Sequence, residues 1–296
     1  MNHDEMTARI AKGQGFIAAL DQSGGSTPKA LRAYGISDDE WDGDDAMFAK
    51  IHDMRSRVIT APSFSSGKVI GAILFEKTMD SDVDGKPTPD ALKARGVVPF
   101  LKVDKGLEDE TDGVQMMKPN PGLDALLQKG KNKGVFGTKM RSVINSANAA
   151  GIAANVAQQF AVGQQILGHG LMPILEPEVS IGAPDRADAE DIVLAEILKG
   201  LDALPDGAQV MLKLTLPVKS NLYKPLVDHP KTLGVVALSG GFCREDACEH
   251  LAENTGMIAS FSRALLEELR ADMTDEQFDA ALGEAINHIH RASIAG

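Results

Sequence analysis

The sequence has little cysteine, few aromatic residues and no long apolar run. It contains 2 Cys, 1 Trp and 2 Tyr in 296 residues. Cys243 and Cys248 are too few for a disulfide framework or a four-cysteine zinc site, so we expect both to be reduced and structural. No stretch reaches the roughly 20 apolar residues of a membrane helix. The start, MNHDEMTARI, lacks the apolar centre of a signal peptide. The sequence therefore predicts a cytoplasmic protein with no membrane partner.

Basic residues are also outnumbered. The chain has 30 Lys+Arg against 42 Asp+Glu, a formal net charge of −12 at pH 7. Because this excess repels nucleic acid, we expect no nucleic-acid partner. A phosphorylated ligand would need a local cluster of Lys and Arg.

Short apolar runs alternate with longer segments of helical period, which is typical of a parallel α/β fold. Eight such units indicate a single α/β domain, a (β/α)8 TIM barrel over residues 1–296, with strands between about 15 and 263 and C-terminal helices over 264–296. The rival is an open doubly wound sheet, but no G-x-G-x-x-G or Walker A motif accompanies the strands. The predicted strands are 15–21, 69–76, 97–104, 134–144, 171–179, 209–217, 234–241 and 256–263.

Helices are predicted between and after these strands, over 145–168, 188–204 and 275–294. Thr27 and Pro28 are expected to cap a further helix. Residues 80–90 and 108–122 read as loops. The tail places five apolar residues on one helical stripe, which predicts an extra C-terminal helix on the barrel exterior. They are Phe278, Leu282, Ala285, Ile286 and Ile289.

Polar residues gather where the predicted strands end, and active sites of barrels form at the carboxyl ends of the strands. Because side chains alternate with period two, residues two apart share a face. If these faces line the barrel, the charges converge into a neutralising network; otherwise they form structural or surface ion pairs. The pairs are Asp21 and Ser23, Lys102 and Asp104, Lys139 and Arg141, Glu176 and Glu178, and Lys213 and Thr215.

Lys213 is the sharpest candidate nucleophile, because MLKLTLP surrounds it with apolar residues. Desolvation and the positive charge of Lys139 would lower its pKa and leave a neutral amine able to attack a carbonyl carbon. The alternative is a lysine that extends out of the strand end. None of the seven histidines falls at a predicted strand end, so we expect no metal and no cofactor.

Two segments are candidate phosphate sites. Ser239, Gly240 and Gly241 precede a predicted helix, and Ser262 and Arg263 follow one strand later. Ser23, Ser26 and Lys29 lie in a glycine-containing turn after the first strand. Either segment alone could be an ordinary turn. Together they would suit a bisphosphate.

The ordered motifs from about residue 15 to about residue 266 resemble class I fructose-1,6-bisphosphate aldolase, in its shorter bacterial branch. The matching segments are AALDQSGGS, ILFEKTMD, GKPTPDALKARGVVPFLKVDKG, GTKMRSVI, PILEPEV, MLKLTLP, LSGG and SFSRAL. The resemblance implies a metal-independent lysine Schiff base that cleaves fructose 1,6-bisphosphate into dihydroxyacetone phosphate and glyceraldehyde 3-phosphate, in glycolysis or gluconeogenesis.

The resemblance also implies a role for each matching residue. Lys213 matches the Schiff-base lysine, Glu176 the general acid/base with Glu178 beside it, and Asp21 the aspartate that orients the reacting hydroxyl. Lys139 matches the lysine that contacts the intermediate. The remaining matches are substrate-binding: Arg141, Lys102, Ser23, Ser26 and Lys29 towards the aldehyde half, and Ser239, Gly240, Gly241, Ser262 and Arg263 towards the ketone-side phosphate.

Two positions depart from the animal enzymes of this family. Ser262 replaces a glycine, and the terminal tyrosine that assists proton transfer has no counterpart, since the only tyrosines are Tyr34 and Tyr223. The proton donor to the enamine carbon therefore stays open. So do a homo-oligomeric state, a Schiff-base aldolase for another phosphorylated ketose, and a catalytically silent metabolite-binding barrel.

Overall fold

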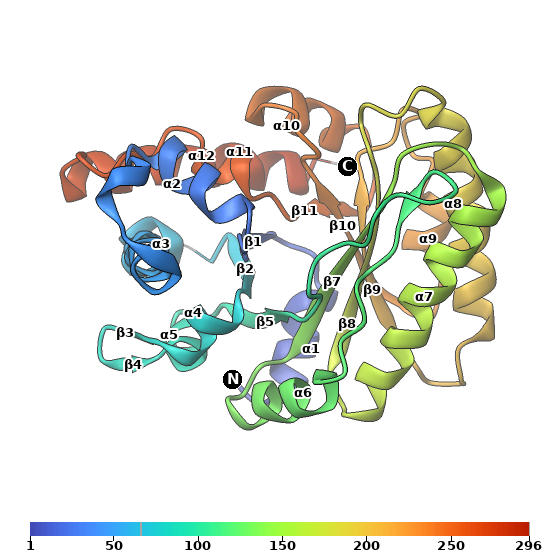
Figure 1. Ribbon diagram of the computed structural model, residues 1–296, viewed down its shortest axis with the longest axis horizontal. Helices are drawn as coiled ribbons and strands as arrows, with labels where there is room; N and C mark the ends of the chain where they lie inside the picture. Colours follow the sequence, from blue (N-terminus) through green and yellow to red (C-terminus); the bar gives the residue numbers. More distant parts are fainter. Residues whose placement is uncertain (66, 296) are drawn as a thin grey trace.

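The computed structural model describes residues 1–65 and 67–295, so the last residue of the predicted domain lies outside it. Eight parallel strands form a nearly closed barrel with helices between them, as predicted (Figure 1). Their order around the barrel is the order of the chain. They are Phe16–Leu20 (β1), Val69–Leu74 (β2), Val98–Lys102 (β5), Gly137–Ile144 (β7), Met172–Val179 (β8), Val210–Thr215 (β9), Thr232–Leu238 (β10) and Met257–Ala259 (β11).

The barrel is least regular where its first and last strands meet. Neighbouring strands elsewhere pair in parallel ladders, such as Gly137–Ile144 of β7 against Met172–Val179 of β8. At the seam between β1 and β11, the backbone N–H of Ala19 donates to the carbonyl of Phe261 at 3.1 Å. This contact joins the strand that leads to Asp21 to the segment that leads to Arg263.

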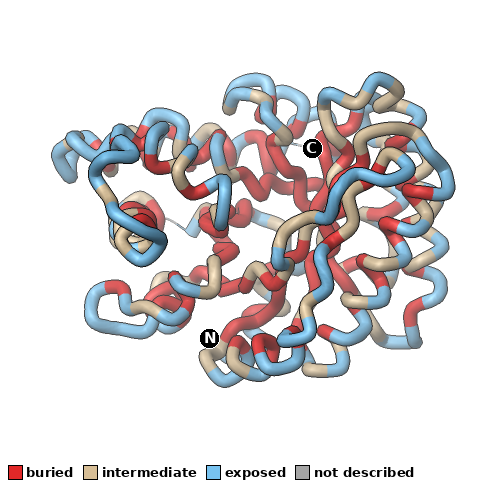
Figure 2. Tube along the Cα trace, in the orientation of Figure 1, coloured by how far each residue is buried: buried red, intermediate tan, exposed pale blue. Residues whose placement is uncertain are grey.

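A short N-terminal helix, His3–Ala11 (α1), closes the amino-terminal end of the barrel. Its buried residues, Met6 and Ile10, pack with apolar side chains that point into the barrel from the strands. The ring of His3 lies 5.1 Å from that of Phe136. In Figure 2 the strands at the centre of the molecule are largely coloured as buried, whereas the outer helices and loops carry most of the exposed residues. The interior below the strand ends is thus filled by apolar side chains rather than open. The strand residues of this cluster include Ile17, Ala19, Phe100, Ile174, Met211, Val236 and Ile258.

The outer helices bury their apolar stripes against the strands. The final helix, Asp275–Ser293 (α12), buries all five residues of the predicted stripe. The other helices are Ser26–Tyr34 (α2), Gly43–Thr60 (α3), Glu76–Asp80 (α4), Thr88–Ala94 (α5), Leu123–Asn132 (α6), Ala149–Gly168 (α7), Arg186–Ala203 (α8), Lys224–Val227 (α9), Arg244–Ala252 (α10) and Arg263–Leu266 (α11). No helix in the described ranges is both long and apolar enough to cross a membrane.

Three local predictions need correction. The segment 80–90 contains the hairpin strands Asp82–Val83 (β3) and Lys86–Pro87 (β4), and 108–122 contains Val114–Gln115 (β6), which pairs antiparallel with β7. Thr27 does not cap α2: it lies inside the helix, whose N-cap is Gly25, without a side-chain cap.

Both cysteines are free, as expected; Cys248 is buried, whereas Cys243 is exposed and its sulfur caps α10.

Candidate active site

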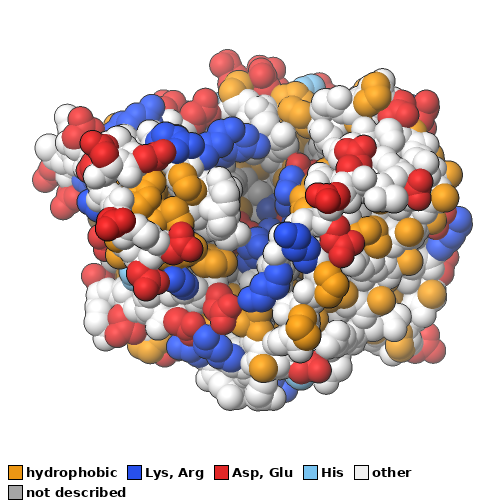
Figure 3. Space-filling model, viewed as in Figure 1, with side chains coloured by type: hydrophobic (Ala, Val, Ile, Leu, Met, Phe, Trp, Pro, Cys, Tyr) orange, Lys and Arg blue, Asp and Glu red, His pale blue; other side chains and the backbone are white. Residues whose placement is uncertain are grey.

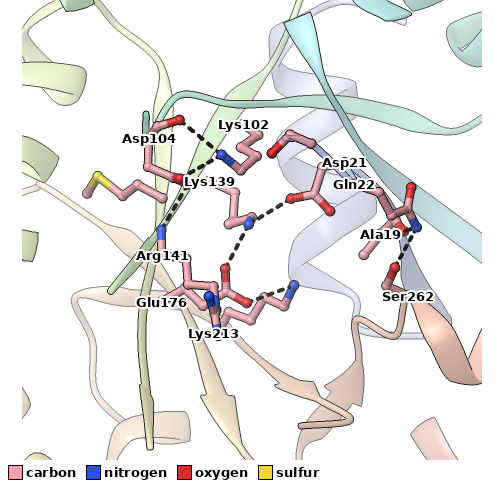
Figure 4. Close-up of polar contacts among 12 residues, drawn as sticks. Ala19, Asp21, Gln22, Lys102, Asp104, Lys139, Arg141, Glu176, Lys213 and Ser262 are labelled. Atoms are coloured by element: carbon pink, nitrogen blue, oxygen red, sulfur yellow. Dashed lines mark hydrogen bonds and ion pairs between the residues drawn. The ribbon is translucent and has the colours of Figure 1, made fainter. Parts of the chain in front are cut away.

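A layer of charged side chains lies directly above the apolar filling of the barrel. Ala19, Ile174 and Met211 belong to that filling, and the residues two positions later are Asp21, Glu176 and Lys213. Because the side-chain period of a strand is two, each polar residue points to the same side as its apolar predecessor. Figure 4 shows Asp21, Lys139, Glu176 and Lys213 converging from different strands. The structure therefore brings these four predicted residues together.

Glu176 is the centre of this layer. One of its carboxylate oxygens lies 3.0 Å from Nζ of Lys213, and the other lies 2.9 Å from Nζ of Lys139. Nζ of Lys139 also lies 2.7 Å from a carboxylate oxygen of Asp21. All four side chains are buried. Two ammonium groups and two carboxylates thus neutralise one another, which is what makes their joint burial tolerable.

The charges of this cluster shift the pKa values of two of its members, Asp21 and Lys139. Burial alone would raise the pKa of Asp21, but the positive charges of Lys139 and Lys213 outweigh it and hold that pKa well below its usual range. Burial would lower the pKa of Lys139, but Asp21, Glu176 and Asp104 raise it instead. Asp21 is therefore a carboxylate, and Lys139 an ammonium group, across the neutral range.

The immediate partner of Lys213 is an acid rather than the cation that the sequence analysis stressed. A carboxylate oxygen of Glu176 lies 3.0 Å from Nζ of Lys213, close enough for direct proton exchange. An ammonium group has no free electron pair for a carbonyl carbon. Attack by this lysine would thus begin with proton transfer to a base, and Glu176 is already in contact with it.

A second ion-paired group borders the first. Nζ of Lys102 lies 2.6 Å from Asp104, whose other carboxylate oxygen accepts the backbone N–H of Arg141 at 3.2 Å. The side chain of Arg141 is paired with Glu178. Burial opposes ionisation of Arg141, but its contact with Glu178 raises the pKa of the guanidinium. This group places two cations beside the layer that holds Lys213.

The turn after β10 is shaped by two glycines. Gly240 and Gly241 have φ of +60° and +129°, which favours glycine. A Cβ on Gly240 would come within 2.8 Å of Ile181, and one on Gly241 would lie 3.9 Å from a guanidinium nitrogen of Arg263. The turn and Arg263 are therefore neighbours. Figure 3 shows Lys and Arg side chains around a hollow near the centre of the face shown.

One backbone N–H group at the predicted helix N-terminus beside this turn is already occupied by an acidic side chain. Helix α10 begins at Arg244, three positions after Gly241, and the backbone N–H of Arg244 donates to a carboxylate oxygen of Glu267 at 3.0 Å. An acidic side chain of the protein itself thus occupies the position that an anion would take. On this side of the site, the remaining candidates for binding a phosphate are the Ser239–Gly241 turn, Ser262 and Arg263.

The second candidate phosphate turn is more exposed. The hydroxyl of Ser26 donates to the carbonyl of Ser23 at 2.8 Å and accepts the Ser23 backbone N–H at 2.9 Å. Lys29 is exposed on the next turn of α2. The two serines thus contact each other, while Lys29 supplies charge nearby.

One group beside the site was missed in the sequence analysis. Arg55 of α3 is fully buried and contacts Gln22, which directly follows Asp21. The signal was present, because Arg55 lies on the stripe formed by Ile51, Met54, Val58 and Ile59, at positions where a helix faces the core. An arginine on an apolar stripe indicates a buried partner.

The family described as fructose-bisphosphate aldolase class-I matches residues 3–232. The chain belongs to this family. A class I aldolase of this kind is a carbon–carbon lyase that works through a Schiff base, and the aldolase family acts on sugar phosphates. This confirms the resemblance to the family inferred from the motifs.

Two solved structures share the fold. Fructose-bisphosphate aldolase from Plasmodium falciparum, in complex with TRAP and a small molecule inhibitor, is 20% identical with a TM-score of 0.79, over 99% of this chain and 95% of that one. A Corynebacterium glutamicum protein is 15% identical with a TM-score of 0.57, over 98% of this chain and 92% of that one. At 20% and 15% identity, both similarities show a shared fold and nothing more.

Proposed function

We propose that this aldolase cleaves fructose 1,6-bisphosphate reversibly into dihydroxyacetone phosphate and glyceraldehyde 3-phosphate, with Lys213 as the Schiff-base residue and without a metal. The observation that carries the proposal is the contact of Lys213 with Glu176 at 3.0 Å, inside the barrel and above its apolar filling. A buried lysine with an adjacent base is the arrangement that imine formation needs. The reaction would serve glycolysis or gluconeogenesis.

Imine formation is the first half of the mechanism. Glu176 takes a proton from the ammonium of Lys213, and the free amine attacks the C2 carbonyl of the ketose to form a carbinolamine. The carbinolamine oxygen is protonated and leaves as water, which gives an iminium ion. Its positive charge attracts electrons from the C3–C4 bond. Lys139, which contacts both Glu176 and Asp21, and Asp21 itself orient the hydroxyl groups of the substrate.

Carbon–carbon cleavage is the second half. The carboxylate of Glu176 removes the proton of the C4 hydroxyl, the C3–C4 bond breaks and its electron pair forms an enamine on C3. Glyceraldehyde 3-phosphate leaves. Protonation at C3 and hydrolysis of the imine release dihydroxyacetone phosphate and restore the amine. Arg263 and the Ser239–Gly241 turn bind the phosphate on the ketone side, while Lys102 and Arg141 lie towards the aldehyde half.

Reduction by borohydride tests this proposal directly. Incubation with fructose 1,6-bisphosphate and borohydride should fix the ketone fragment on Lys213, as located by mass spectrometry of the digested protein. Lys213→Arg keeps the positive charge but should give neither adduct nor turnover, and Lys219→Arg, at an exposed position beyond β9, should behave as wild type. Substrate attached to another lysine, or turnover by Lys213→Arg, contradicts the assignment.

A Schiff-base aldolase for a monophosphorylated ketose is the second candidate. It is favoured by the turn after β1, where the hydroxyl of Ser26 is already hydrogen-bonded to the backbone N–H and carbonyl of Ser23 instead of lying free for a second phosphate. Cleavage rates of fructose 1,6-bisphosphate and fructose 1-phosphate, both in EDTA, distinguish the two. A preference for fructose 1-phosphate would support the second candidate.

A further inference from the structure

A buried guanidinium group without an acidic partner lies behind the candidate site. Arg55 is 0% exposed. Its donors reach the Gln22 carbonyl at 2.5 Å, the Gln22 side-chain oxygen at 3.0 Å and the Thr78 hydroxyl at 2.7 Å. Within the described residues these partners are all neutral, and Nε has none. Burial lowers the pKa of Arg55 to about 10, against the opposing charge of Asp21, so the group is still charged at neutral pH.

Burying a charged guanidinium group of this kind destabilises the fold unless its contacts compensate. Removing a charge from water is unfavourable unless hydrogen bonds or an opposite charge compensate. The planar fork of arginine is what allows contact with two oxygens of Gln22 and with Thr78 at once, and lysine has no equivalent geometry. Arg55 thereby ties α3 and α4 to the residue that immediately follows Asp21.

Gln22 also contacts the far side of the seam between β1 and β11. Its side-chain nitrogen donates to the hydroxyl of Ser262 at 2.6 Å, as Figure 4 shows, and to the carbonyl of Ala19 at 3.3 Å. Ser262 directly precedes Arg263, whose guanidinium lies next to Gly241. Among the described residues, the backbone contact across the seam at this level is the one from Ala19 to Phe261. The side-chain contact between Gln22 and Ser262 therefore adds to this one backbone contact in holding the two strand ends together here.

We propose that Arg55 is a positioning residue that, through Gln22 and Ser262, holds the β11 end where Arg263 meets the phosphate on the ketone side of the substrate. The inference rests on the proposed function. Arg55 touches no reacting atom in this scheme. Replacing Arg55 should therefore weaken the binding of a ketone that carries a phosphate more than the binding of one that does not.

Two ketones that differ only in the phosphate provide the test. The efficiency of borohydride trapping is measured with dihydroxyacetone phosphate and with unphosphorylated dihydroxyacetone, and their ratio gives the contribution of the phosphate. Arg55→Lys should lower this ratio about tenfold, while trapping of dihydroxyacetone changes less than about twofold. Gln22→Met should lower it similarly, and the double variant no further, because both residues act along one path.

Arg57→Lys is the matched control. Arg57 lies on the same helix but contacts Tyr34, Met273 and Asp275, away from the seam, so its ratio should equal that of wild type. Equal losses with both ketones, or an unchanged ratio in Arg55→Lys and Gln22→Met, would overturn the inference. If wild type is trapped with neither ketone, the proposed function fails and this inference fails with it.

Discussion

Lys213 and Glu176 are in direct contact, with 3.0 Å between Nζ of the lysine and a carboxylate oxygen of the glutamate. The other oxygen of Glu176 lies 2.9 Å from Lys139. The same carboxylate is therefore placed to take a proton from the nucleophile and to balance a second fixed cation. This double role makes Glu176, after Lys213, the second position on which the proposed mechanism depends.

Glu176→Gln should keep the shape of the site and remove its base. We expect kcat to fall by about 10² to 10⁴-fold, the usual contribution of general acid–base catalysis, with KM changed only a few-fold. Steady-state kinetics with fructose 1,6-bisphosphate measure both values. Glu190→Gln is the control, because that buried carboxylate pairs with Arg186 on α8 and should affect stability rather than kcat. Equal kcat values for the two variants would remove Glu176 from the mechanism.

Asp21 should not produce the acidic limb of the pH–rate profile. Because its folded pKa lies below the unfolded value of 3.8, it is ionised throughout the working range. Asp21→Asn should therefore lower kcat by a similar factor from about pH 5 to about pH 9 without moving the acidic limb. A depressed pKa also means that the stability contributed by Asp21 is present above 3.8 and is lost as pH falls through the folded pKa.

The check on stability compares wild type with Asp21→Asn by thermal unfolding as the pH is lowered. The difference in Tm should be largest near neutrality and should shrink in the acid range below about pH 4. A gap that grows on acidification would mean that Asp21 is not stabilised as a carboxylate.

Arg263→Ala should weaken recognition of the phosphate next to the ketone. A hydrogen bond to a charged group contributes about 1.5 to 3 kcal/mol, so the preference for fructose 1,6-bisphosphate over fructose 6-phosphate should drop about 10- to 100-fold in kcat/KM. Lys29→Ala is the comparison. Because Lys29 is assigned to the other phosphate, this variant should lower the preference for fructose 1,6-bisphosphate over fructose 1-phosphate instead. An unchanged preference in Arg263→Ala would contradict the assignment of this side of the site.

Ile10→Ala should destabilise the protein without changing the chemistry. Ile10 is 2% exposed where α1 fills the end of the barrel, and its truncation should lower the free energy of unfolding by about 2 to 5 kcal/mol. Denaturant unfolding gives this value, and kcat at low temperature should match wild type. Ile294→Ala, at a 52% exposed position, should change little. Comparable stability of both variants would show that α1 does not support the barrel.

The strands and the charged layer were predictable because both follow from period-two alternation. Glu176 follows an apolar run and Lys213 lies within one, and the rule that barrel sites form at the carboxyl ends of strands is enough to place them together. The stripe of α12 was predictable for the same kind of reason, with helical period in place of strand period.

The parts that were missed depend on contacts between distant segments. Helix α1 has only Met6 and Ile10 to bury, too short a pattern to predict that it closes the barrel. The carboxylate of Glu267 at the start of α10 comes from a turn 23 residues later in the chain, so no local motif predicts it. Spacing alone also did not show that the immediate neighbour of Lys213 is Glu176 rather than Lys139, because that depends on the curvature of the barrel.

Helix α1 closes the amino-terminal end of the barrel, and this constrains the order in which products leave the site. Since α1 and the apolar layer fill the space beneath Lys213, both fragments of a cleaved substrate must depart through the same mouth. In the proposed mechanism the ketone fragment is still bound to Lys213 when the C3–C4 bond breaks, so the aldehyde leaves first and, in synthesis, binds last. An ordered kinetic sequence then follows from this covalent attachment together with a single opening.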